Sequence, residues 1–107
     1  MIKNLKEVVP SPVNQELLNG KDIVIYGTGR KGLQIFMQLF NYGIYVKYFC
    51  DSDCKKQKIK VMNKEVISPE KLSSFKNNVN VIIGSTDYED EIYERLQNLQ
   101  IEDIFRF

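Results

Sequence analysis

Apolar residues gather in short runs that predict five strands. Ile23–Tyr26 is continuously apolar and Val79–Ile83 nearly so, as is typical of central strands covered on both faces of a parallel sheet. Ile44–Cys50 is rich in β-branched and aromatic residues and predicts another strand. Val66–Ile67 predicts a short strand, and residues 103–107 predict a final edge strand.

The segment between the first two strands has helical periodicity. It runs from Lys31 to Asn41, and Gly43 is expected to end it, because glycine adopts the positive φ of a helix C-terminus without a steric penalty. Apolar residues at i, i+3, i+4 and i+7 predict one stripe that faces the core. This stripe consists of Leu33, Phe36, Met37 and Phe40.

Two more helices are predicted after later strands. Ser68 followed by Pro69 is typical of an N-cap and a first helical position, and predicts a short helix to about Phe75. Thr86 as N-cap and Glu89 three residues later fit a capping box. The helix expected after that box has its own apolar stripe, Tyr88, Ile92, Leu96 and Leu99.

The alternation of strands and helices favours a three-layer α/β/α domain of Rossmann type. We expect a parallel sheet of four or five strands in the order 3-2-1-4-5. Residues 21–107 would form this domain. Residues 1–20 would form a lead-in with a short helix, which begins at Ser11–Pro12 and ends at Gly20.

Composition is that of a single globular domain. The chain has 107 residues, of which 43% are hydrophobic and 27% charged, which excludes a disordered chain. A net charge of +1 gives no argument for a nucleic-acid partner. The longest apolar run is too short to span a bilayer, and the N-terminus lacks the apolar core of a signal peptide. We therefore expect a cytoplasmic protein with no membrane span and no nucleic-acid partner.

The sequence contains few of the residues that commonly act in catalysis. The chain has no histidine, which excludes His-based triads, His general bases and His-ligated metals. Cys50 and Cys54 are too few to complete a zinc site, so we interpret the first as buried, the second as incidental, and expect no metal. No tyrosine is followed four residues later by lysine, the pair that short-chain sugar dehydratases use as general base. No catalytic residue is identified.

A glycine-rich loop joins the first buried strand to the first helix. Its spacing, Gly27-x-Gly29-x-x-Gly32, is that of a dinucleotide-binding loop in the strand–loop–helix setting that the motif requires. We expect the first glycine to allow a tight turn, the second to let a diphosphate approach the backbone, and the third to let the helix pack closely. The helix N-terminus would direct free N–H groups at the anion. The loop also contains Thr28 and two cations that are either phosphate ligands or solvated side chains, Arg30 and Lys31.

Further candidates follow the neighbouring strands. Asp51 ends the second strand about 20 residues after the loop, where an acid accepts hydrogen bonds from ribose hydroxyls and repels a 2′-phosphate. Ser52 comes next, while Gly84 and Ser85 end the strand across the switch point, where ligands bind in doubly wound sheets. These positions favour NAD or a UDP-type nucleotide over NADP. The alternative is that the glycines serve only a tight turn.

These residues carry a resemblance to a known family. Ile25–Gly32, Gly43–Val46, Phe49–Asp53 and Val66–Leu72 together resemble a bacterial Rossmann-like nucleotide-binding domain of polysaccharide- and sugar-modifying proteins. That domain occurs beside sugar dehydratases, glycosyltransferases, methyltransferases and acyltransferases. The chain is more loosely similar to CoA-binding domains and to the cofactor domain of redox-sensing repressors. The resemblance implies that the three glycines bind phosphate and that Asp51 contacts the ribose.

Three functions remain open from the sequence. The favoured one is a nucleotide-binding domain, with NAD(H) as ligand and UDP-sugar or CoA as alternatives, inside a larger sugar-modifying protein or complex that supplies the catalytic groups. The second is the cofactor half of a nucleotide-sugar oxidoreductase or dehydratase. The third is an interaction domain that kept the fold and lost the ligand.

Overall fold

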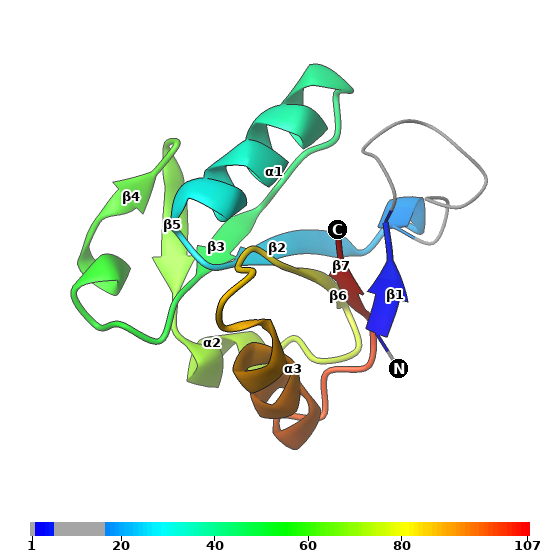
Figure 1. The fold of residues 1–107 in the computed structure, drawn as a ribbon, viewed down its shortest axis with the longest axis vertical. Coiled ribbons are helices and arrows are strands. Elements are labelled where there is room, and N and C mark those ends of the chain that lie inside the picture. The colour runs from blue at the N-terminus through cyan, green and yellow to red at the C-terminus, as the bar shows by residue number, and fades with distance from the viewer. Residues whose placement is uncertain (1, 6–16) are drawn as a thin grey trace.

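The computed structural model describes residues 2–5 and 17–107 (Figure 1). Its strands are β1 (Ile2–Asn4), β2 (Asp22–Tyr26), β3 (Tyr48–Cys50), β4 (Lys60–Val61), β5 (Lys64–Ile67), β6 (Val79–Ile83) and β7 (Ile104–Arg106). Its α-helices are α1 (Arg30–Asn41), α2 (Pro69–Ser73) and α3 (Glu89–Asn98). The beginning of the helix predicted from Ser11–Pro12 to Gly20 lies outside the described residues, and Gly20 has a φ of +86°.

The strands form one mixed sheet in the order β1-β7-β6-β2-β3-β5-β4. Neighbouring strands are parallel except for β4, which pairs antiparallel with β5. The sheet has seven strands, so the predicted count of four or five was wrong. β4 has only two residues and β1 three, and neither lies in an apolar run that would indicate a strand. β1 also pairs with β7, so the C-terminal strand is not the edge strand that the sequence predicts.

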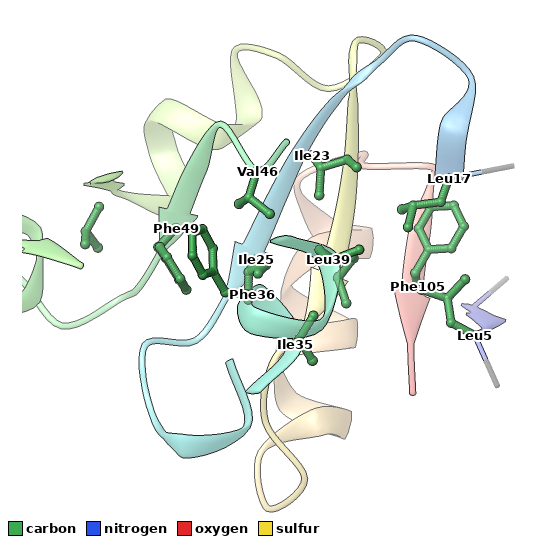
Figure 2. Packing of buried hydrophobic residues seen from close by; sticks show 12 residues of the cluster. Leu5, Leu17, Ile23, Ile25, Ile35, Phe36, Leu39, Val46, Phe49 and Phe105 are labelled. Carbon is green, nitrogen blue, oxygen red and sulfur yellow. The ribbon is translucent and has the colours of Figure 1, made fainter. Parts of the chain in front are cut away.

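Helices cover both faces of the sheet (Figure 1). On one face, Ile35 and Leu39 of α1 belong to a buried cluster with Ile25 of β2, as Figure 2 shows from close by. On the other face, Leu72 of α2 and Leu96 of α3 belong to a second cluster. The predicted α/β class and its three layers are therefore confirmed.

The buried side of α1 differs from the predicted stripe. Met37 is 43% exposed and Phe40 66% exposed. The residues that are buried start one position earlier in the same i, i+3, i+4, i+7 spacing: Gly32, Ile35, Phe36 and Leu39. The glycine sets this rotation, because it lies against the backbone of the loop that follows β2 and turns its own side of the helix toward the sheet.

Helix α3 begins later than the capping box predicts. Its N-cap is Tyr88, not Thr86, and no side chain caps it. Instead, the hydroxyl of Ser85 accepts a hydrogen bond from the backbone N–H of Tyr88 at 3.2 Å, which turns the chain before the helix starts. In the predicted stripe, Leu96 is fully buried and Tyr88 is 60% exposed.

The predicted start of α2 is confirmed, whereas one predicted strand is shorter than expected. The hydroxyl of Ser68 accepts a hydrogen bond from the backbone N–H of Lys71 at 3.0 Å, and Pro69 is the first residue of α2, as predicted. The strand expected over 44–50 is shorter, because only Tyr48–Cys50 makes ladder pairs with β2.

Asp103, near the C-terminal end of the sheet, contacts two lysines from the N-terminal part of the chain, and these contacts predict that stability depends on pH. It accepts hydrogen bonds from Lys3 at 3.0 Å and from Lys21 at 2.5 Å. The hydrogen bond from Lys21, followed by that from Lys3, holds the pKa of Asp103 below its ordinary value despite partial burial.

A depressed carboxyl pKa stabilises the fold above the unfolded-state pKa and loses that effect as the pH falls through the folded-state pKa. Asp103→Asn should therefore lower the free energy of unfolding by about 1 kcal/mol at pH 7. The difference from the parent should shrink below about pH 4, where the unfolded carboxyl is protonated. Urea unfolding of the parent and of Asp103→Asn at pH 7 and below about pH 4 measures this difference. An equal loss of unfolding free energy under both conditions would contradict an electrostatic origin.

Candidate functional site

The carboxyl ends of β2, β3 and β6 lie side by side and form the floor of a cleft. Tyr26 at the end of β2 is in register with Cys50 of β3 on one side and with Ile83 of β6 on the other. The residues that follow these strands line a cleft of 1050 Å³. All of the predicted site residues except Gly32 line it: Gly27, Thr28, Gly29, Arg30, Lys31, Asp51, Ser52, Gly84 and Ser85.

Gly32 lies beneath the cleft, where glycines pack against one another. A Cβ on Gly27, whose φ is +122°, would meet the carbonyl oxygen of Gly84 at 2.8 Å. A Cβ on Gly84 would meet the Cα of Gly32 at 2.9 Å, and a Cβ on Gly32 would collide with the carbonyl oxygen of Gly27. This contact brings the loop, α1 and the end of β6 together, as the sequence predicts for the third glycine.

Gly29 has the opposite environment. It is the N-cap of α1, with ordinary φ of −85°, and a Cβ placed on it would have nothing within 4 Å. The glycine therefore leaves open space in front of the helix N-terminus. No side chain caps α1 and no acidic residue lies in its first turn. Its first N–H groups, which have no partners within a helix, face that space with the positive end of the helix dipole.

Asp51 lies across from this loop at the end of β3. One oxygen of its carboxylate, Oδ2, accepts a hydrogen bond from the Thr28 hydroxyl at 2.8 Å. The other, Oδ1, accepts one from the backbone N–H of Asp53 at 2.9 Å. The two parts of the predicted site are thus joined directly, by a side-chain contact between loops that are 23 residues apart in the chain.

Tyr26, which the sequence indicates only as part of a buried strand, lies at the floor of the cleft. Tyr26 is 3% exposed, and burial raises the pKa of its hydroxyl, an effect that hydrogen bonding with Ser52 and Arg95 partly offsets. Nη1 of Arg95, on α3, lies 3.5 Å from that hydroxyl. Cys50 is buried as predicted, and burial strongly raises the pKa of its thiol, so it stays protonated and unreactive near neutral pH.

The α3 side of the cleft was not predicted. The sequence places Ser85 at a strand end, but which side chains of the following helix reach the cleft depends on where that helix begins. The cleft is also lined by Gln34, Asp53, Lys56, Thr86, Asp87, Tyr88, Glu91, Ile92 and Arg95.

Across the described part of the chain, no group of three or more His, Cys, Asp or Glu residues is placed to hold a metal ion.

A family model described as C2185-like, N-terminal, matches residues 19–104. No curated protein matches the chain. Within the ranges 2–5 and 17–107, no helix has the length and apolar character needed to cross a bilayer.

Solved structures resemble most of the chain. One is UDP-D-quinovosamine 4-dehydrogenase from Vibrio fischeri, with 25% identity and a TM-score of 0.65 over 81% of this chain and 77% of that one. Another is RSP, a Rex-family repressor, with 20% identity and a TM-score of 0.62 over 89% of this chain and 49% of that one. RSP has also been solved with β-NADH, at 21% identity, and with β-NAD+ and operator DNA, at 22%. The chain thus matches about half the length of RSP, and this likeness shows a shared Rossmann-like fold.

Proposed function

The chain belongs to the C2185-like N-terminal family, and we propose that it binds NAD(H) in the cleft at the ends of β2, β3 and β6. The observation that carries the proposal is the open space at Gly29, in front of the uncapped N-terminus of α1. A diphosphate would lie in that space, because backbone N–H groups and the helix dipole both favour an anion there. Arg30 and Lys31 line the same opening and would balance its charge.

Asp51 supports a ribose with free hydroxyls next to the diphosphate. Its carboxylate lines the cleft across from Gly29. A carboxylate at this position accepts hydrogen bonds from the 2′- and 3′-hydroxyls and repels a 2′-phosphate, so NAD(H) is favoured over NADP(H). The structures of RSP with β-NADH and β-NAD+ add support, because RSP shares the fold.

A UDP-sugar is the second candidate ligand. It would present the same chemistry to the cleft, a diphosphate followed by a ribose. The observation in its favour is the likeness to UDP-D-quinovosamine 4-dehydrogenase over most of both chains. CoA is a third ligand to test, since it also carries a diphosphate.

We further propose that this domain works inside a larger bacterial sugar- or polysaccharide-modifying protein or complex. The chain has no histidine, and no tyrosine is followed four residues later by lysine, so two common sources of a general base are missing from it. Catalytic groups would then come from another domain or a partner protein.

Calorimetric titration of the purified chain with NADH, NAD+, a UDP-sugar and CoA tests the proposal. We expect saturable binding to one site for NADH and NAD+, and weaker or no binding for CoA. Preferential saturation by the UDP-sugar would support the second candidate. If none of the four ligands binds, the proposed function is wrong. Titration with duplex DNA belongs in the same series, because RSP binds operator DNA while the net charge of +1 predicts no such partner here.

A further inference from the structure

The Asp51 carboxylate is restrained from several sides. Its oxygens each accept one hydrogen bond, Oδ2 from the Thr28 hydroxyl and Oδ1 from the N–H of Asp53. Its backbone is held as well, because its N–H donates to the carbonyl of Ile67 at 3.1 Å and its own carbonyl accepts from the Gln57 side chain at 2.8 Å. The position and the plane of the carboxylate are therefore both set by neighbours.

Thr28 makes the one contact among these that comes from the glycine loop. The Asp53 N–H, Ile67 and Gln57 all belong to the segment from β3 to β5 and would hold Asp51 whatever the loop did. Thr28 lies between Gly27 and Gly29, on the strand side of the open space at the helix N-terminus. Its hydroxyl therefore sets the carboxylate relative to the place where the proposed diphosphate would lie.

We propose that Thr28 is a positioning residue that determines selectivity for the ribose. The inference rests on the proposed function. A carboxylate oxygen has two lone-pair sites, so each oxygen of Asp51 keeps one free for a ligand after its internal hydrogen bond is made. The fixed carboxylate presents these sites together to the two adjacent hydroxyls of an unmodified ribose.

The same restraint acts against a 2′-phosphate. A carboxylate that is free to rotate can turn away from a phosphate, whereas one held by Thr28 and Asp53 must face it with its charge. Lys56 also lines the cleft and would attract a 2′-phosphate once the carboxylate moved. Selectivity between NADH and NADPH thus depends on the hydrogen bond from the Thr28 hydroxyl to the Asp51 carboxylate.

The test is the ratio of dissociation constants for NADPH and NADH in Thr28→Val and Thr28→Ser, measured from the emission of the nicotinamide ring. Valine has nearly the shape of threonine and lacks the donor, whereas serine keeps it. We expect the NADPH-to-NADH ratio to fall about tenfold in the valine variant, since a hydrogen bond to a charged group is worth at least one factor of ten. The serine variant should keep the parent ratio.

A double-mutant cycle of Thr28→Val with Asp51→Asn shows whether Thr28 acts by positioning the Asp51 carboxylate or by a general effect on the structure of the loop. If Thr28 acts through the carboxylate, Thr28→Val should change the ratio no further once the carboxylate is gone. If Thr28→Val lowers the affinity for both dinucleotides by the same factor, or for neither, the ratio is unchanged. That result would overturn the inference while leaving NAD(H) binding intact. If the parent protein binds neither dinucleotide, the proposed function fails and the inference fails with it.

Discussion

Gly29→Asp should abolish dinucleotide binding and leave the fold at least as stable as the parent. Aspartate is among the best N-cap residues, and its charge suits the positive end of a helix dipole. The position has an ordinary φ of −85° and open space around it, so the side chain fits without strain. The same carboxylate would occupy the space proposed for the diphosphate and repel it. We expect at least a hundredfold loss of affinity for NADH, which corresponds to about 2.7 kcal/mol.

Asn41→Asp is the matched control for this prediction. It adds the same carboxylate at the exposed last residue of α1, which lies outside the residues that line the cleft. A negative charge at the C-terminal end opposes the helix dipole, so it should lower stability by a few tenths of a kcal/mol and leave NADH binding unchanged. Calorimetric titration and thermal unfolding of both variants measure the two effects. Full NADH affinity in Gly29→Asp would place the ligand elsewhere.

Gly32→Ala should destabilise the domain by about 1–3 kcal/mol, the usual cost of overpacking a filled site. The added Cβ would collide with the carbonyl oxygen of Gly27, a backbone atom that cannot move aside as a flexible side chain could. The sign of this change in stability is informative, because in a helix interior without such a contact alanine is about 1 kcal/mol more stabilising than glycine.

The stability of Gly32→Ala is measured by urea unfolding and compared with that of Gln38→Ala. Gln38 lies on the exposed side of the same helix, so its replacement reports intrinsic helix propensity and should change stability by less than about 0.5 kcal/mol. A Gly32→Ala protein as stable as the parent would show that α1 can move away from the loop, and the close packing would then not be required for the fold.

Much of the site could be predicted because its parts follow strand ends. A glycine loop after β2, an acid after β3 and a Gly-Ser pair after β6 come together wherever parallel strands end at one edge. The sequence could not show the bridge from Thr28 to Asp51, because a contact between two loops depends on tertiary placement. Nor could it show that Tyr26, in an apolar strand, lines the floor of the cleft.

The errors in the fold have local physical causes. Periodicity predicted that the buried stripe of α1 starts at Leu33, but the close approach of Gly32 to the backbone turns the side that starts at Gly32 toward the sheet. Thr86 and Glu89 have the spacing of a capping box, but the Ser85 hydroxyl contacts Tyr88 instead and the helix begins later. β1 and β4 are held by neighbours in the sheet and have no periodicity of their own.

The pairing of β1 with β7 has a consequence for how the domain is made. The two strands pair Ile2 with Ile104, so β1 finds its partner only after the strands between them have been produced. Contacts between residues so far apart along a chain form slowly, because a long loop must close before they are made. On the ribosome, β2, β3 and β5 can associate early, while the edge of β6 stays without a neighbour until translation reaches β7. The nascent domain therefore exposes an unpaired strand edge until β7 has been made, and a chaperone that shields such edges would have the most effect before that point.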